Sequence, residues 1–361
     1  MRKPLTLVIV ISLLLTLAPF ALAVPVVGIL GDSLSDEYSE QVYGAYSQNW
    51  VQQFAQASTI NVGPITPGMG EPRRNGYEYN WARYGASSDS LLSTGQHTGL
   101  AAQVPIKGIQ YGVLAIGAND FFPGGPGTAY DAIYNSISSP LLAPYIASRI
   151  TNVTTAFNTV KATGLPMVLV NYPDYSVTAY AQAAYPIAAQ RQLVSDVING
   201  INLQIKALAQ ANHVPLVDLN AFAANIFGSN ASPHSSVTIG GVAIKLTGAG
   251  NIDNGSVGTK TAGFVEDGIH PNTTLQGVLG NTIVTALNLG YNANIPLFTE
   301  QQILAHKGLA YGGSDTLAAT FGAYGNYVVN YVPEPSSVIL LGLGMIVLVG
   351  HAARVRRRVG R

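Results

Sequence analysis

The sequence has 361 residues and is electrically balanced, with 18 basic and 18 acidic side chains. Between Val24 and Tyr331, however, 11 basic residues stand against 17 acidic ones, and this sparsely charged, acidic body argues against nucleic-acid binding, which requires clustered Lys and Arg. The sequence contains no cysteine, which excludes disulfides and thiolate metal sites.

The first 23 residues have the pattern of a secretory signal peptide. Arg2 and Lys3 form a basic start, residues 5–22 are almost all apolar, and Ala21-Leu22-Ala23 ends the segment in a small-x-small pattern. We expect export and cleavage after Ala23; an uncleaved membrane anchor is the alternative.

Runs of strand length alternate with helical segments along the next 260 or so residues. The runs are apolar on both faces, as in the central strands of a parallel sheet: Val24–Leu30, Gly112–Ile116, Met167–Asn171 and Val214–Asp218, with a weaker run near Tyr77–Arg83. The helical segments are Asn49–Ala57, Pro144–Thr163 and Ala188–Ala211. This alternation predicts a three-layer α/β/α sandwich around a central, mostly parallel five-stranded sheet, with right-handed crossovers.

Two stretches interrupt this pattern. Residues 232–264 are rich in Gly, Ser, Thr and Asn and contain the short alternating pieces 236–239 and 242–245, so we expect an insertion with a hairpin. Residues 292–330 have weak periodicity, and we expect a surface appendage or linker over 291–331. The sequence leaves open whether the insertion is a lid.

The C-terminal segment, 332–361, carries a third kind of pattern. Val332-Pro-Glu-Pro335 precedes an apolar stretch over residues 338–350, and an arginine cluster follows over 354–358. A helix of that apolar length reaches only about 20 Å, short of a bilayer core of about 30 Å, although extension to Ala353 makes a marginal single span. The arginines would then remain on the cytoplasmic side.

These three features in this order resemble the PEP-CTERM sorting signal of Gram-negative bacteria. The resemblance implies recognition and processing by an exosortase, and a location at the cell envelope, in the periplasm or in the extracellular matrix. An ordinary C-terminal tail anchor is the alternative.

A serine behind the first strand and a late Asp-x-x-His supply the parts of a nucleophilic site. Ser33 stands in Gly31-Asp32-Ser33-Leu34, and the chain returns to Asp267-Gly-Ile-His270 far downstream. A serine hydroxyl is a weak nucleophile at neutral pH and needs a base within hydrogen-bond reach and a third group that holds the base.

Four such blocks, spanning Val24 to about Gly290, resemble the GDSL esterase/lipase family, also called SGNH hydrolases. They are, in the family's order, Gly31-Asp-Ser33-Leu-Ser-Asp36, Asn80-Trp-Ala-Arg-Tyr-Gly85-Ala-Ser-Ser88, Gly117-Ala-Asn119-Asp120 and Asp267-Gly-Ile-His270-Pro271. The resemblance implies a flavodoxin-like hydrolase domain over 24–290.

The resemblance also assigns roles. Ser33 would be the nucleophile, His270 the base and Asp267 the group that orients it. The oxyanion hole would consist of the backbone N–H of Ser33, the backbone N–H of Gly85 and the side-chain amide of Asn119. A side chain in place of Gly85 would crowd the substrate.

Each residue also has a plainer interpretation. Ser33 could cap a following helix, and Asp267 and Asn119 could be turn residues. Asp32 is expected to stabilise the loop behind the nucleophile, and Asp36 could cap the same helix as Ser33. The following groups have no assigned role: four histidines without a paired acid (His97, His213, His234, His306), the pair Arg73-Arg74, and aromatic residues that either line a pocket or pack helices (Phe121, Phe122, Tyr172, Tyr175, Tyr180, Tyr185).

The resulting hypothesis is an exported serine esterase or lipase that cleaves carboxylic esters through an acyl-enzyme. The alternatives are a deacetylase of acetylated exopolysaccharide and a non-catalytic envelope or matrix protein on the same fold. The expected partners are a small-molecule, lipid or polysaccharide ester, a signal peptidase and an exosortase-type enzyme. No cofactor is implied, and no His or carboxylate cluster indicates a metal site.

Overall fold

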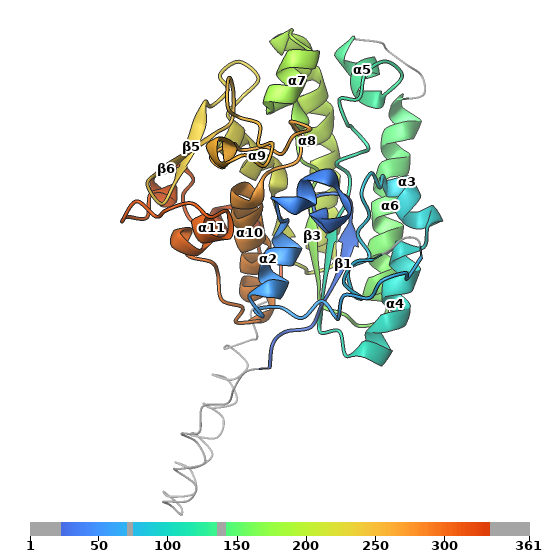
Figure 1. The fold of residues 1–361 in the computed structure, drawn as a ribbon. Helices are drawn as coiled ribbons and strands as arrows, with labels where there is room; N and C mark the ends of the chain where they lie inside the picture. Colours follow the sequence, from blue (N-terminus) through green and yellow to red (C-terminus); the bar gives the residue numbers. More distant parts are fainter. Residues whose placement is uncertain (1–22, 71–74, 136–141, 333–361) are drawn as a thin grey trace, which may run out of the picture.

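A computed structural model describes residues 23–70, 75–135 and 142–332 (Figure 1). Its centre is a five-stranded sheet in the order β1-β2-β3-β4-β7. The strands are β1 (Val27–Gly31), β2 (Tyr111–Ala115), β3 (Met167–Val170), β4 (Leu216–Val217) and β7 (Val328–Val329). The first four are parallel, and β7 runs antiparallel to β4. The predicted three-layer, mostly parallel architecture is therefore confirmed.

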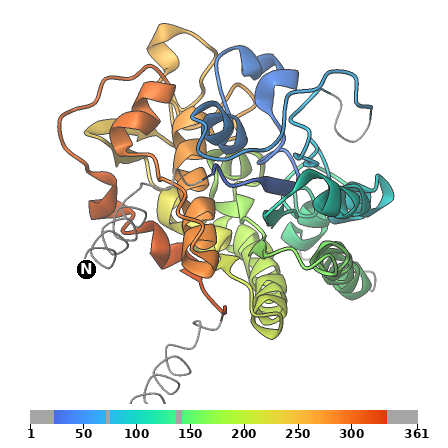
Figure 2. The same ribbon diagram turned by 90° about the horizontal axis from the view of Figure 1, so that it is seen from below.

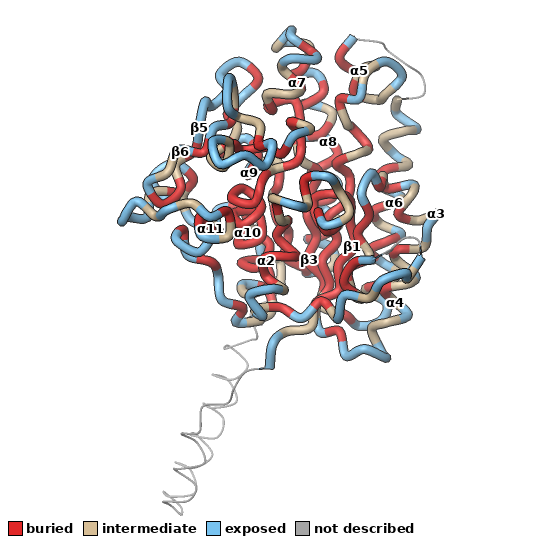
Figure 3. The backbone as a smooth tube through the Cα atoms, in the orientation of Figure 1, coloured by how far each residue is buried: buried red, intermediate tan, exposed pale blue. Residues whose placement is uncertain are grey.

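Neighbouring residues of each strand point into two separate cores, which is the signature of a sheet covered on both faces. Val113 and Val168 belong to one core, and Leu114 and Leu169 to the other. Figure 2 shows helices on both sides of the sheet, and Figure 3 shows that the strands and α10 are buried along most of their length.

The helices divide between the two faces. The first core contains side chains of α2 (Trp50–Gln56), α9 (Leu219–Phe227), α10 (Thr273–Tyr291), α11 (Glu300–His306) and α12 (Leu317–Thr320). The second contains side chains of α3 (Ser88–Ser93), α4 (Gln96–Lys107), α5 (Ala129–Tyr134), α6 (Leu142–Lys161), α7 (Ala179–Ala184) and α8 (Ala188–Ala211). The three predicted helices correspond to α2, α6 and α8.

The prediction of a weak strand near Tyr77–Arg83 is wrong, because this segment forms only isolated bridges, between Asn80 and Ile29 of β1 and between Tyr77 and Ile65. The Ile29 N–H donates to Tyr79 O and the Trp81 N–H donates to Ile29 O, at 3.0 and 2.8 Å. The Asn80 side chain then accepts the Ala82 N–H at 3.2 Å, which turns the chain away from the sheet. The fifth strand is instead β7.

The predicted hairpin is present as β5 (Ser236–Ile239) and β6 (Val242–Lys245), which pair antiparallel. Gly240 and Gly241 join them, both with positive φ, as a two-residue turn of this kind requires. The Gly240 N–H donates to the side chain of Glu300, so the segment after α10 holds the tip of the hairpin.

The expectation of a surface appendage over 291–331 is wrong. Seven apolar side chains of this segment are at most 5% exposed: Ile295, Phe298, Ile303, Leu304, Leu317, Phe321 and Tyr327. Lys307 forms a buried ion pair with Asp253 of the insertion and donates to Tyr46 O at 2.7 Å. The segment is therefore an integral part of the first core, and the weak periodicity reflects short elements rather than exposure.

Among the described residues, no helix is both long and apolar enough to cross a membrane. The predicted signal peptide, apart from its last residue, and the predicted apolar tail helix lie outside the described residues.

Candidate active site

The structure brings Ser33, His270 and Asp267 together at the carboxyl end of β1. Ser33 is 3% exposed and lies in the turn that follows the strand. His270 Nε2 lies 2.7 Å from Ser33 Oγ, and His270 Nδ1 lies 2.5 Å from Asp267 Oδ2. These two contacts form a continuous hydrogen-bonded chain from a carboxylate through an imidazole to a hydroxyl, across 237 positions of sequence.

The turn from Asp267 to His270 is built by the carboxylate itself. Asp267 Oδ1 accepts the N–H groups of Ile269 and His270 at 2.9 and 3.0 Å, which leaves Oδ2 for the imidazole. Burial tends to raise the pKa of Asp267, but these bonds and the contact with His270 outweigh it and lower the pKa below its ordinary value. The carboxylate thus contributes to stability above pH about 4, and this contribution is lost as the pH falls through the lowered pKa.

Three tyrosines without a role predicted from the sequence enclose the imidazole. The rings of Tyr43 and Tyr84 lie 5.8 and 5.3 Å from the His270 ring, at shallow angles, and Tyr38 meets it edge-on at 6.1 Å. Tyr38 is fixed in turn, because its hydroxyl donates to Pro271 O at 2.9 Å. The three tyrosines restrict the orientation of the His270 ring. They can be recognised as part of the site only from these contacts in the folded chain.

Asp32 joins the loop of Ser33 to the loop of Asn119. Its Oδ1 accepts the Leu34 N–H and its Oδ2 accepts the Ala118 N–H, both at 3.1 Å. Burial raises the pKa of Asp32 to about 6. These bonds support the expectation that Asp32 stabilises the loop behind the nucleophile.

The three candidate oxyanion donors lie on loops that contact the triad or one another. Among the described residues, no acceptor pairs with the N–H of Ser33 or of Gly85. Asn119 Nδ2 donates to Ala86 O at 2.9 Å, next to Gly85. Gly85 has φ +73°, and no atom lies within 4 Å of the position that a Cβ would take. A side chain there would meet open space beside the site, where a substrate would lie.

Asp36 does not cap a helix, which was one interpretation of its position. Its Oδ2 accepts Arg83 Nη1 at 2.9 Å and the Tyr84 N–H at 2.6 Å. Arg83 also reaches Glu40 Oε2, at 3.1 Å. Asp36 therefore connects the loop of Ser33 to the backbone beside Gly85.

Glu37 is a buried carboxyl group next to Asp36, and its Oε1 accepts the Tyr77 N–H at 2.7 Å. Burial and the charge of Asp36 raise the pKa of Glu37 well above its ordinary value. Burial raises the pKa of Asp36 as well, to about 7.

Replacing Glu37 by glutamine is expected to flatten the pH dependence of stability. A raised carboxyl pKa favours the folded state at low pH, and this contribution falls as the pH rises from about 4.3 through the folded-state pKa. Thermal unfolding from pH 5 to 8.5 should show wild type losing Tm relative to Glu37→Gln, with the exposed carboxylate variant Asp196→Asn following wild type. Parallel curves for Glu37→Gln and wild type would contradict this.

The predicted aromatic residues separate into two groups. Phe122 lies 5.9 Å from Tyr175 and 6.2 Å from Tyr180, and Tyr180 is 3.9 Å from the Cβ position of Gly268, so this group borders the site. The others are core residues, with Phe121 beside Tyr172 and Tyr185 beside α5.

The remaining candidates do not join the site. In the part of the chain that the structure describes, His270 is the only histidine paired with a carboxylate, and no group of three metal-ligating side chains occurs. Arg73-Arg74 lie outside the described residues.

Comparisons with known proteins give a family. The model of the GDSL-like lipase/acylhydrolase family matches residues 27–283, and that of the PEP-CTERM protein-sorting motif matches residues 332–358. No curated protein matches the chain.

Three similar solved structures are an acetyl xylan esterase from Geobacillus stearothermophilus, a putative acylhydrolase from Bacteroides fragilis and an esterase from a Pseudoalteromonas species. Their identities are 12%, 15% and 14%, and their TM-scores 0.41, 0.40 and 0.35. In the same order, the alignments cover 76%, 73% and 73% of this chain and 96%, 86% and 97% of the other chains. At these scores the structures add nothing to the assignment, which rests on the family model. Because that model spans the chain from β1 into α10, this protein belongs to the GDSL-like lipase/acylhydrolase family and is a hydrolase of ester bonds.

Proposed function

We propose that this protein is an exported serine esterase that cleaves carboxylic esters through an acyl-enzyme on Ser33. The observation that carries the proposal is the hydrogen-bonded chain from Asp267 through His270 to Ser33, with contacts of 2.5 and 2.7 Å. A non-catalytic matrix protein on this fold has no need for such a chain. The proposed oxyanion donors are the N–H groups of Ser33 and Gly85 and the Asn119 amide.

In the proposed reaction, Ser33 Oγ attacks the ester carbonyl carbon while its proton moves to His270 Nε2. Asp267 holds the Nδ1–H and stabilises the imidazolium, and the oxyanion donors bind the charge that develops on the carbonyl oxygen. The C–O bond to the alcohol breaks, and the leaving oxygen takes the proton from His270. Water then repeats the sequence, releasing the acid and restoring Ser33.

An apolar cavity of about 50 Å³ is the proposed acyl site. Its lining includes the chain neighbours of Ser33 and His270, which are Leu34, Ile269 and Pro271. Phe222 and Phe264 belong to the same lining. A cavity needs roughly 10–15 Å³ of such volume to hold one water, so this one has room for only a few carbon atoms.

A chromogenic ester series from acetate to palmitate, measured on residues 24–331 and on its Ser33→Ala variant, tests the proposal. We expect Ser33-dependent hydrolysis that is greatest for short acyl groups and falls steeply for long ones. Identical rates with and without Ser33 would overturn the enzyme mechanism. Turnover confined to acetyl esters would favour a deacetylase of acetylated polysaccharide, and a preference for long chains would favour a lipase and exclude the cavity as the acyl site.

The match to the PEP-CTERM motif over residues 332–358 suggests export and association with the envelope. We propose cleavage of the signal peptide after Ala23 and processing of the C-terminal segment by an exosortase-type enzyme. The intact mass of the native protein tests both steps: a species that begins at Val24 and lacks the arginine cluster is expected, whereas a C-terminus at Arg361 would favour a plain tail anchor.

A further inference from the structure

Asp120 is a buried carboxylate that follows the candidate oxyanion donor Asn119 directly. It is 3% exposed, and its Oδ1 accepts the Ser88 N–H at 3.1 Å and Arg149 Nη1 at 3.3 Å. Its Oδ2 accepts the Tyr172 hydroxyl at 2.6 Å. A buried carboxylate is retained only where such donors compensate its charge, so the position of Asp120 is fixed by these groups.

These bonds join the two loops that carry two of the proposed oxyanion donors, the Gly85 N–H and the Asn119 amide. Ser88 begins α3 and lies three residues after Gly85, so its bond to Asp120 fastens the Gly85 loop to the Asn119 loop. The bond from Asn119 Nδ2 to Ala86 O is a second link between the same two loops. The loops therefore form one unit.

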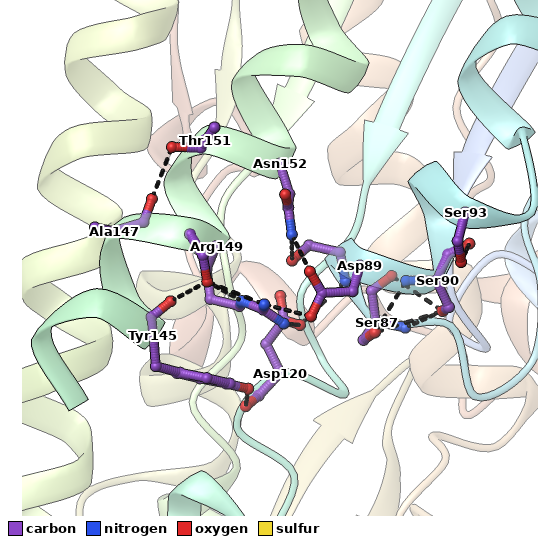
Figure 4. Close-up of polar contacts among 12 residues, drawn as sticks. Ser87, Asp89, Ser90, Ser93, Asp120, Tyr145, Ala147, Arg149, Thr151 and Asn152 are labelled. Atoms are coloured by element: carbon purple, nitrogen blue, oxygen red, sulfur yellow. Dashed lines mark hydrogen bonds and ion pairs between the residues drawn. The ribbon is translucent and has the colours of Figure 1, made fainter. Parts of the chain in front are cut away.

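Side chains of helix α6 contact this unit through Asp89 and Asp120 (Figure 4). Arg149 is 5% exposed, contacts Asp120 and also pairs with Asp89 in the first turn of α3. Its guanidinium lies 4.4 Å from the centre of the Tyr145 ring, and the Tyr145 hydroxyl donates to Asp120 O at 2.6 Å. Asn152, one turn further along α6, donates to Asp89 Oδ1.

Tyr172, just after β3, contacts the same unit from the side of the sheet. Its backbone exchanges two hydrogen bonds of 2.9 Å with the side chain of Asn202 in α8, which fixes the residue at the end of β3. Its ring packs on Gly117, where a Cβ would lie 2.2 Å from the ring, and its hydroxyl binds Asp120. Tyr172 thus contacts both ends of the segment 117–120.

We infer that Asp120, Arg149 and Tyr172 are positioning residues that hold the Gly85 N–H and the Asn119 amide where the oxyanion develops. The inference rests on the proposed function. Oxyanion donors stabilise the transition state because they are oriented before charge develops, and the loss of one costs about 10²–10³ in kcat. Displacing two donors together, while leaving the triad intact, should lower kcat and leave ground-state binding of the ester largely unchanged.

The variants that test this are Tyr172→Phe, which removes one oxygen atom, and Arg149→Met with Arg149→Lys as the conservative partner. Tyr291→Phe is the matched control. The Tyr291 hydroxyl also donates one partly buried hydrogen bond, to Met167 O at 2.7 Å, at the opposite end of β3. We expect kcat on a short ester to fall about 10–100-fold in Tyr172→Phe and Arg149→Met, with KM within about threefold, partial recovery in Arg149→Lys and no change in Tyr291→Phe.

A second measurement separates positioning from general damage. In a thionoester the carbonyl oxygen is replaced by sulfur, a poorer and larger acceptor, so the preference for the normal ester reports the oxyanion donors. Asn119→Ala serves as the benchmark for a lost donor. We expect the ratio of ester to thionoester turnover to fall at least about tenfold in Tyr172→Phe and in Arg149→Met. This fall should be smaller than the one caused by the loss of a whole donor in Asn119→Ala.

Unchanged kcat and unchanged ester preference in Tyr172→Phe would overturn the inference. An equal loss on both substrates, accompanied by a large fall in Tm, would also overturn it, because that pattern indicates only a structural role. If wild type itself has no Ser33-dependent turnover, the proposed function fails, and the inference falls with it; the Ser33→Ala comparison distinguishes this case from the other two.

Discussion

Replacing His270 by alanine is expected to lower kcat for ester hydrolysis by about 10⁴–10⁶-fold, the range found when the base of a serine triad is removed. In the proposed mechanism His270 Nε2, which lies 2.7 Å from Ser33 Oγ, accepts the serine proton, and an unassisted hydroxyl is a poor nucleophile at neutral pH. Asp267→Asn should cost less, about 10⁴-fold, because the imidazole remains but loses its charged partner. Initial rates on a short chromogenic ester measure both effects.

The control for this prediction is His213→Asn. His213 is exposed, follows α8 at the end of the sheet opposite Ser33, and has φ +54°, a conformation that asparagine tolerates. This variant should retain full activity. The far-UV spectrum and the Tm of His270→Ala should match those of wild type, so that the loss is chemical. Unchanged turnover in His270→Ala would place the base elsewhere and remove the assignment.

The sequence predicted the fold where the segments are long and strongly patterned. Helix α8 was expected over Ala188–Ala211 and is observed over those residues, because apolar side chains recur every three or four positions along it. Strand β7 has only two residues, Val328 and Val329, and pairs with β4 more than 100 positions earlier. No local pattern distinguishes such a strand from a loop, and its pairing is set by tertiary packing.

The site divides in the same way. Ser33, Asp267 and His270 stand in short motifs whose chemistry can be recognised locally. Arg149, in contrast, lies on α6 between Ser148 and Ile150, and an arginine in a helix normally faces solvent. Its contact with Asp120 depends on how α6 packs against the loop after β2, and Tyr84 likewise reaches His270 only through the folded chain. Residues that orient a site through long-range contacts leave no signal in spacing.

A chain that ends at residue 290 is expected not to fold, whereas a chain that ends at 331 should fold and keep full activity. The segment 291–331 buries seven apolar side chains, and burial of each contributes about 1.5–3 kcal/mol, or roughly 10–20 kcal/mol in total. This gross contribution is of the same order as the net stability of a typical domain, about 5–15 kcal/mol, although ordering the segment offsets part of it. Circular dichroism, soluble yield and ester turnover of chains 24–290 and 24–331 would measure the difference.

A single substitution examines the same segment without truncation. Lys307→Met removes the partner of Asp253, whose side chain is fully buried, and breaking a buried ion pair from one side costs about 3–5 kcal/mol. Lys260→Met is the matched control, because Lys260 is half-buried and its ammonium makes a long contact of 3.4 Å with Gly308 O. Lys307→Met should therefore unfold at a clearly lower urea concentration than Lys260→Met.

If chain 24–290 were as stable and active as chain 24–331, the segment 291–331 would be a dispensable appendage after all, and its buried side chains would contribute nothing to the core.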